Sequence, residues 1–272
     1  MEILKAILFG IVEGITEWLP VSSTGHLILL EEFVQLGVSE AVYEMLQVVI
    51  QLGAILAVLG LFFHKLNPFS GQKTPAQRQD TWTLWGRVIL AVLPSAVLGL
   101  LFDDWMDAHL YNYRVVAVML IVYGVAFLVA ERGRKTANIG DVHQIDCRTA
   151  VLIGAFQSLS LIPGTSRSGA TILGALLLGV SRPAGAEFSF FLAIPTMVGA
   201  SGLKLLKFLM EGNVPTGNEM MILLIGCLVS FLVSLLVIKT LMEYVRRHSF
   251  AVFGVYRIIL GAAVLLYFAL RG

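Results

Sequence analysis

Six stretches of the chain are long and apolar enough to cross a lipid bilayer, and this feature limits the fold more than any other. A transmembrane helix needs about 20 mostly apolar residues. The chain is 57% hydrophobic and 14% charged, with a mean hydropathy of +0.85, whereas soluble domains carry about 25% charged residues. We therefore expect an all-α integral membrane protein. The predicted spans are residues 44–63, 85–102, 113–131, 186–209, 218–240 and 250–270.

Two further apolar regions, 3–36 and 149–181, are interrupted midway by polar runs around Pro20 and Pro163. Each uninterrupted piece has about 12–15 residues and therefore reaches only partway through a bilayer. Irregular backbone survives at membrane depth only when it is buried in protein or lines a wet cavity. Each region therefore predicts a re-entrant pair of half-helices that enters and leaves from one face.

The two broken regions match each other at a constant offset along the chain. The matched residues are Gly10 with Gly154, Glu13 with Gln157, and Gly25 with Gly169. Each region is followed by three predicted spans, so the second half begins on the opposite face of the membrane from the first. We predict one membrane domain, 1–272, built as an inverted repeat with halves 1–131 and 149–272. Inversion would bring both polar turns to the middle of the membrane.

Lysines and arginines gather in the loops 64–84, 132–148 and 240–249, whereas the opposite loops are acidic or neutral. The positive-inside rule makes the basic side cytoplasmic. We therefore expect a multi-pass protein of the bacterial inner membrane, with both termini in the periplasm. If one broken pair crossed the membrane instead, the orientation of everything after it would reverse.

Composition also excludes some functions. A net charge of +1 and a pI near 7.8 leave no basic face able to neutralise several phosphates of a nucleic acid. Cys147 and Cys227 lie in different settings, one beside a basic loop and one inside an apolar run. Neither a disulfide framework nor a thiolate metal site is indicated.

The first polar turn carries acids and hydroxyls. Glu13 and Glu17 are one helical turn apart and share a face. Intramembrane acids indicate function, and two close carboxylates suit a divalent cation, Mg²⁺ or Ca²⁺, or a general base. The alternative is a structural pairing with a basic residue elsewhere.

Beyond Pro20, Ser22, Ser23 and Thr24 are favourable N-caps for the second half-helix, whose free N–H groups favour an anion. His26 lies within helical reach of Ser22 and Ser23. It could serve as the base for either hydroxyl, or it could attack phosphorus itself.

The second polar turn resembles a phosphate-binding loop. Arg167 can grip a phosphate through two N–H groups, and glycine lets the backbone approach closely. The alternative is a structural ion pair between Arg167 and Glu13 or Glu17. No lysine of the nucleotide P-loop follows, so ATP is not indicated. The candidate binding residues here are Gly164, Thr165, Ser166, Ser168, Gly169 and Thr171, and Gln51 is a further candidate for a polar contact.

At these two turns the chain resembles the bacterial undecaprenyl-diphosphate phosphatases of the bacitracin-resistance type. The paired glutamates, the S-S-T-G-H run that ends at His26 and the P-G-T-S-R-S-G-A-T run that ends at Thr171 carry the resemblance, which extends over essentially the whole chain. It implies hydrolysis of undecaprenyl diphosphate to the monophosphate on the periplasmic side, which recycles the lipid carrier of cell-wall peptidoglycan synthesis. It also implies a divalent cation and essential roles for Glu13, Glu17, His26 and Arg167. Ser23 is the family's candidate nucleophile, with His26 the competing one.

Two other functions remain open. Inverted repeats with broken helices are also a transporter architecture, so a polyprenyl-phosphate transporter or flippase is the alternative. Another class of membrane phosphatase places a histidine shortly after a Ser-Arg pair, but Leu173 stands at that position here. The expected partners are a polyprenyl diphosphate and membrane lipid, with no nucleic acid, and the sequence is compatible with a homodimer.

Overall fold

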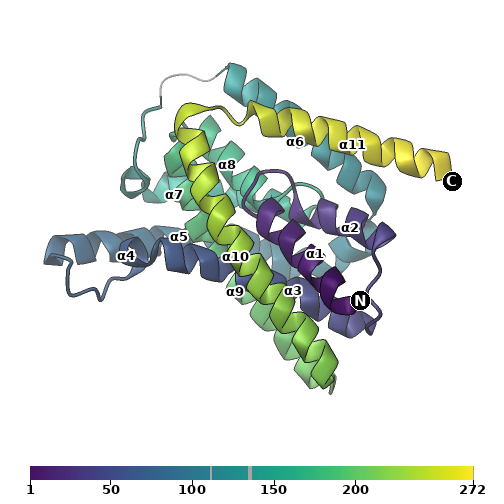
Figure 1. Ribbon diagram of the computed structural model, residues 1–272. Coiled ribbons are helices and arrows are strands. Elements are labelled where there is room, and N and C mark those ends of the chain that lie inside the picture. The colour runs from purple at the N-terminus through teal and green to yellow at the C-terminus, as the bar shows by residue number, and fades with distance from the viewer. Residues whose placement is uncertain (111, 134–136, 272) are drawn as a thin grey trace.

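The computed structural model describes residues 1–110, 112–133 and 137–271, and within these ranges the chain is helical, without a β-strand apart from one isolated bridge between Ile139 and Val180. Six helices are long and apolar enough to cross a membrane (Figure 1). The predicted all-α membrane fold with six spans is therefore confirmed. These helices are α3 (Glu40–Leu61), α5 (Pro75–Leu110), α6 (Tyr113–Arg132), α9 (Arg182–Met210), α10 (Gly217–Arg247) and α11 (Ala251–Arg271).

The two broken regions form pairs of short helices. The first pair is α1 (Glu2–Thr16) and α2 (Ser23–Phe33), and the second is α7 (Cys147–Ser158) and α8 (Arg167–Leu177). Helices of 11 to 15 residues are about 16–22 Å long, which is less than the roughly 30 Å hydrocarbon core. The remaining elements are α4 (Phe63–Leu66) and two 3₁₀ turns, η1 (Val142–Gln144) and η2 (Leu159–Leu161).

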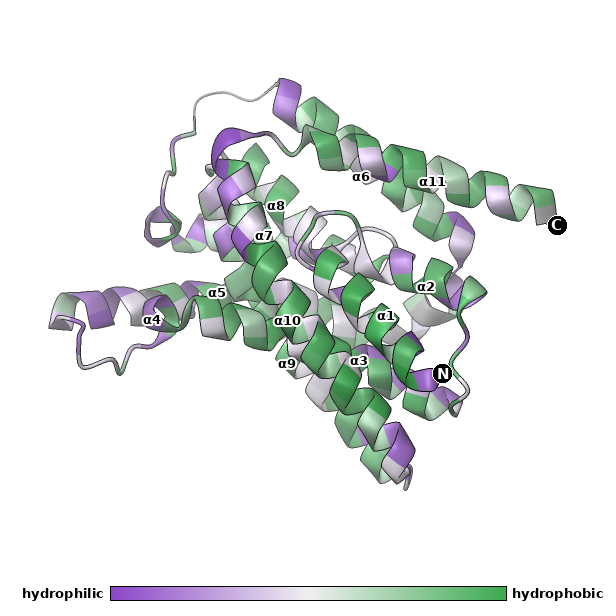
Figure 2. Cartoon of the chain, in the orientation of Figure 1, coloured by the Kyte–Doolittle hydropathy of each residue, from purple (hydrophilic) through white to green (hydrophobic). Residues whose placement is uncertain are grey.

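Several helices extend beyond the apolar segments from which they were predicted. α5 begins at Pro75 and continues to Leu110, and α10 ends only at Arg247. The predicted loops 64–84 and 240–249 are therefore largely helical. Hydropathy detects only the part of a helix that is apolar, whereas the backbone continues as a helix until a capping residue ends it. Figure 2 shows this as hydrophilic ends on apolar helices.

Long helices from each half of the chain pack against helices of the other half. α10 packs against α1 and α3, while α5 packs against α7. Both contacts depend on glycine: a Cβ on Gly10 of α1 would lie 2.6 Å from the Gly226 carbonyl oxygen of α10, and a Cβ on Gly154 of α7 would overlap the Ala91 carbonyl oxygen of α5. The short helices are thus held by close backbone contact with long ones.

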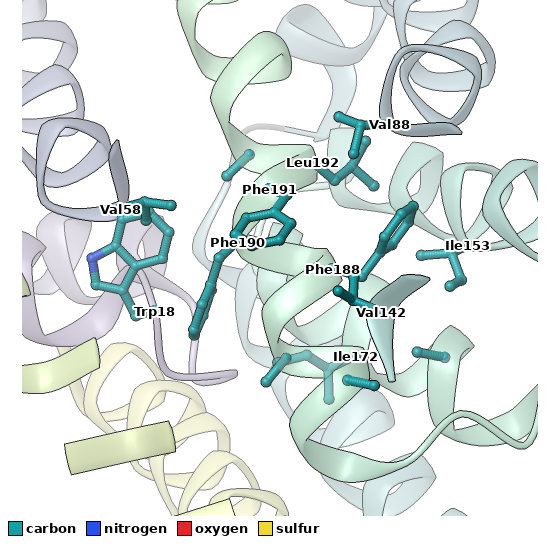
Figure 3. Packing of buried hydrophobic residues seen from close by; sticks show 14 of the residues in the cluster. Trp18, Val58, Val88, Val142, Ile153, Ile172, Phe188, Phe190, Phe191 and Leu192 are labelled. Carbon is teal, nitrogen blue, oxygen red and sulfur yellow. The ribbon is translucent and has the colours of Figure 1, made fainter. Parts of the chain in front are cut away.

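The largest buried cluster joins the first turn to the second half of the chain. Trp18 is fully buried and meets Phe190 of α9 edge to face, with ring centroids 5.3 Å apart. Figure 3 shows Phe190 between Trp18, which lies beside Val58, and the residues around Phe188 and Val142. This cluster supports the polar turn that follows Trp18, because a fully packed core allows little movement of the backbone it carries.

Candidate active site

The two polar turns end in the same unusual backbone conformation. Ser22 and Ser166 are the N-caps of α2 and α8, and both have positive φ, +75° and +73°. Among the described residues, no other non-glycine residue has positive φ. Each serine hydroxyl accepts a hydrogen bond from a glycine N–H, that of Gly25 at 3.3 Å and that of Gly169 at 3.1 Å. A strained φ of this kind costs about 1–3 kcal/mol and is concentrated at functional sites.

Glu17 joins the two turns. Its Oε2 accepts a hydrogen bond from the Ser23 hydroxyl at 2.6 Å. Its Oε1 accepts from Arg167, at 3.2 Å from Nη2 and 3.4 Å from Nε. All three side chains are almost completely inaccessible to solvent. Residues that are far apart in the sequence therefore meet at one carboxylate.

Arg167 is held in place by its surroundings. Its Nη1 donates to the Ser189 carbonyl oxygen at 2.8 Å, and its guanidinium lies 5.7 Å from the centre of the Trp18 ring. These contacts leave the guanidinium facing Glu17. The structural ion pair considered as an alternative for Arg167 is thus present, with Glu17 as its partner. The contacts with Glu17 and Ser189 use three of the five N–H groups of the guanidinium.

Glu13 is fully buried, and neither of its carboxylate oxygens has a hydrogen-bond partner. Burial of an unpaired carboxylate is strongly unfavourable unless a proton or a cation neutralises it. Glu17 lies one helical turn further on, so the two carboxylates face the same region.

This donor set fits a divalent cation. Nowhere in the described part of the chain do three or more His, Cys, Asp or Glu side chains gather around one point. Glu13 and Glu17 are therefore the residues that would hold such a cation, through two carboxylates alone. Mg²⁺ commonly binds through one or two carboxylates and phosphate oxygens.

His26 has different partners from those that the sequence predicted. Its Nδ1 lies 2.7 Å from the Ser22 carbonyl oxygen, and its Nε2 lies 2.6 Å from the Tyr256 hydroxyl oxygen. A carbonyl oxygen only accepts, so Nδ1 carries a proton. The expected hydrogen bond from His26 to a serine hydroxyl is absent, and the Ser23 hydroxyl donates to Glu17 instead. Helical spacing correctly places His26 near Ser22. The imidazole ring, however, is directed to the backbone carbonyl oxygen of Ser22 and not to a side-chain hydroxyl.

The other predicted residues of the second turn divide into two groups. Ser168 and Thr171 have structural partners: Ser168 donates to the carbonyl oxygens of Glu17 and Leu19 at 3.1 Å, and the hydroxyls of Thr171 and Ser189 are 2.6 Å apart. Thr165, in contrast, is fully buried and its hydroxyl has no partner. Its hydroxyl is therefore a buried polar group whose hydrogen bond is not made within the protein, in contrast to those of Ser168 and Thr171. The positive φ of Gly164, +89°, and the 2.5 Å between an added Cβ and the Val116 oxygen require glycine at that position.

Thr24 and Gln51 lie outside this group. They line a cavity of about 470 Å³ together with Gln47, Asn112 and Lys204. None of the residues Glu13, Glu17, Ser23 and Arg167 lines it, although Thr24 follows Ser23 directly. The cavity lies at the end of the molecule at which α6 begins, since Asn112 and Tyr113 also line it.

Tyr256 and Arg257, consecutive residues of α11, belong to the site and were not predicted. Arg257 is completely buried. It donates to the carbonyl oxygens of Pro20 at 3.0 Å, Gly164 at 2.7 Å and Thr165 at 2.9 Å. One guanidinium thus ties both turns together through their backbones. A charged residue inside an apolar span is itself a functional signal, so the sequence did contain a clue to Arg257.

Comparison with known proteins gives a consistent result. A family model described as bacitracin resistance protein BacA matches residues 6–263. A protein of Enterococcus faecalis is 55% identical over 265 residues, which cover 97% of this chain and 96% of that protein. One of Limosilactobacillus fermentum is 56% identical over 272 residues, 99% of each chain. One of Streptococcus thermophilus is 55% identical over 273 residues, all of this chain and 95% of that one. All three are named undecaprenyl-diphosphatase.

Proposed function

We propose a function from one premise: this chain belongs to the bacitracin resistance protein BacA family. It is a multi-pass membrane phosphatase that hydrolyses undecaprenyl diphosphate to undecaprenyl phosphate and inorganic phosphate. The lipid product is the carrier of cell-wall synthesis, which can then be used again. The observation that carries this proposal is the meeting of Ser23, Glu17 and Arg167 from the two turns.

The first chemical step uses the Ser23–Glu17 hydrogen bond. Glu17 takes the proton from the Ser23 hydroxyl as Oγ attacks the terminal phosphorus. The bond between that phosphorus and the bridging oxygen breaks, and Glu17 passes the proton to the departing monophosphate lipid. Arg167 neutralises charge on the phosphoryl oxygens as it develops. The result is a phosphoserine.

The second step regenerates the serine. Glu17 takes a proton from a water molecule, whose oxygen attacks the phosphoserine phosphorus. The Oγ–P bond breaks, and Glu17 returns the proton to Ser23 Oγ while inorganic phosphate leaves. His26 as the nucleophile is the competing route, but its two ring nitrogens already face Ser22 and Tyr256, which favours Ser23.

Glu13 and Glu17 would hold the divalent cation, Mg²⁺ or Ca²⁺, which supplies charge neutralisation to the diphosphate. The unpartnered oxygens of Glu13 support this assignment. The N–H groups at the start of α8 and the free hydroxyl of Thr165 are further donors to phosphate.

The lipid tail has a place beside the reacting groups. An almost entirely apolar cavity of about 440 Å³ is lined by Val12, Leu19, His26, Val252 and Tyr256. Its walls suit the first isoprene units, while the diphosphate lies at the polar turns. This arrangement favours a phosphorylated lipid over a water-soluble phosphate ester.

We also propose that the molecule is an inverted repeat with two re-entrant pairs. The shared positive φ of Ser22 and Ser166 and the matched glycine contacts of Gly10 and Gly154 support it. Both termini would be periplasmic, and the site would open to the periplasm through the cavity that Thr24 and Gln51 line. Two further statements stay predictions: that the protein lies in the bacterial inner membrane, and that it forms a homodimer.

Phosphate release by purified protein tests the proposal. With a polyprenyl diphosphate and Mg²⁺ in detergent, wild type should release inorganic phosphate, and Ser23→Ala should lower the rate at least about 100-fold. Ser39→Ala is the matched control, because Ser39 is also an N-cap, that of α3, but lies outside the site.

Trapping the phospho-enzyme distinguishes the two nucleophiles. An acid-stable phosphoserine trapped from wild type would support Ser23, and an acid-labile phosphohistidine would support His26. Lipid translocation into liposomes without phosphate release would contradict the enzyme and favour the transporter.

A further inference from the structure

A second polar cavity lies at the basic end of the spans and does not include any residue of the candidate active site. Its volume is about 540 Å³. It lies between the end of α3, the short helix α4, the start of α9 and the last third of α10. The hydrophilic residues at this end of α10 are visible in Figure 2.

One face of α10 supplies most of the lining. Met242 and Glu243 lie three and four residues after Lys239, and Arg246 lies four and three residues after them, which places all four on the same side of a helix. Arg247 lies beside them. The basic side chains are therefore directed into one space rather than distributed around the helix.

The positive charge of this cavity is only partly neutralised. Lys65 of α4 pairs with Glu187 of α9 at 2.6 Å. Lys239, Arg246 and Arg247 have no carboxylate within ion-pair distance among the residues that the structure describes. Glu243 is the one remaining acid that lines the cavity. An anion of moderate size would therefore be attracted to it.

The surface that leads to the cavity is suited to an acyl chain. Leu224, Leu228, Leu232 and Leu236 of α10 are exposed by 62%, 56%, 53% and 69%. Their spacing of four residues forms a continuous stripe, and it ends one turn before Lys239. Within a membrane span such a stripe faces lipid, so an acyl chain lying on it would place its headgroup at the cavity.

From this geometry we propose that the cavity formed by Lys65, Lys239, Arg246 and Arg247 binds the headgroup of an anionic phospholipid, with an acyl chain on the leucine stripe. Basic pockets between membrane helices on the positively charged side bind such headgroups. The apolar stripe favours a lipid over a free phosphate. This site is independent of the proposed catalysis, because it shares no residue with it.

Native mass spectrometry can test the proposal without any substrate. Purified full-length protein in a non-ionic detergent would be mixed with equal amounts of phosphatidylglycerol and phosphatidylcholine. We expect retention of one phosphatidylglycerol in preference to phosphatidylcholine. The triple variant Lys239→Gln/Arg246→Gln/Arg247→Gln should lose retention about tenfold, because each basic residue near the headgroup contributes to binding.

The matched control removes the same charge elsewhere on the basic side. Arg78→Gln/Arg132→Gln/Arg148→Gln changes three exposed arginines that do not line the cavity, and it should retain the lipid as wild type does. Equal loss in both triple variants, equal retention of the two lipids, or unchanged retention in the first variant would overturn the proposal. Displacement by soluble glycerol phosphate would show a free phosphate site, and stronger retention of a polyprenyl monophosphate would show a different lipid as the occupant; either result would contradict the assignment.

Discussion

At the scale of single residues, Glu13 and Glu17 differ sharply although they share a helix face. Glu17 has a hydroxyl on one oxygen and a guanidinium on the other, whereas Glu13 has no partner for either oxygen. In the proposed mechanism both carboxylates would hold the cation, and Glu17 would in addition move the proton of Ser23. Two chemically identical side chains thus differ in what surrounds them, and the surroundings set the properties of a carboxylate.

The substitution Glu13→Gln should separate these tasks. It removes an unpaired buried carboxylate, so we expect the heat resistance of the cation-free protein to rise or stay unchanged. The Mg²⁺ concentration for half-maximal phosphate release should rise at least about tenfold, and Mg²⁺ should no longer raise the thermal midpoint. A chelator should abolish wild-type activity reversibly. Glu17→Gln serves as the contrast, since it should lower kcat at saturating Mg²⁺. An unchanged Mg²⁺ requirement in Glu13→Gln would remove Glu13 from the cation site.

Tyr256→Phe should impair the reaction through His26. The variant loses the 2.6 Å contact with Nε2 and keeps the ring that lines the apolar cavity. The family resemblance implies an essential role for His26, and the tautomer and direction of its ring depend on the hydrogen bonds of both nitrogens. We therefore expect kcat to fall about tenfold with little change in KM.

Tyr244→Phe is the matched control for that experiment. The Tyr256 ring is parallel to the ring of His26, and the Tyr244 ring stacks in the same way on His248, at the C-terminal end of α10 and outside the site. Its kinetics should equal those of wild type. If Tyr256→Phe behaved like this control, the His26–Tyr256 contact would have no part in catalysis.

The residues of the site were only partly predictable from the sequence. Polar residues in apolar surroundings identified Glu13, Glu17, Ser23 and Arg167, because such residues are rare within membrane segments. The partner of His26 was not predictable, since it depends on the direction of one ring beside a serine with positive φ.

At the scale of elements, α11 was identified as a span but not as part of the site. Arg257 contacts the first turn at Pro20 and the second turn at Gly164, and only the packed structure shows where α11 lies relative to both. The number and type of helices could be predicted because bilayer thickness imposes a length and an apolar composition on each span. Which helix packs on which turn depends on side-chain and backbone fit, which periodicity does not encode.

The contact between α7 and α5 should be sensitive to a single methyl group. In Gly154→Ala the new Cβ would overlap the Ala91 carbonyl oxygen, and backbone cannot move aside as a side chain can. We expect stability to fall by about 1–3 kcal/mol, measured as loss of monodisperse protein after heating in detergent. Gly60→Ala in α3 is the matched control, since an added Cβ there meets no atom within 4 Å. Equal heat resistance of the two variants would argue against close packing of α7 on α5.

At the scale of the whole molecule, the proposed orientation can be tested with the native thiols. Cys147 is exposed at the start of α7, on the basic side. In a Cys227→Ser background, a membrane-impermeant maleimide should label Cys147 only after the cells are permeabilised. Asn213→Cys, in the exposed segment between α9 and α10, should be labelled in intact cells once Cys147 is replaced by serine. The reverse pattern would invert the orientation and place the site opening in the cytoplasm.

The packing of helices from one half of the chain on helices of the other also affects the order in which the protein can fold during synthesis. α1 packs against α10, and α10 begins only at Gly217. While the chain is being synthesised, α1 and its buried carboxylate, Glu13, must therefore wait for most of the later helices to leave the ribosome before α10 is present. Insertion of the first helices into the membrane and completion of the fold are consequently separate events, because α1 gains its final neighbour only when α10 has been made.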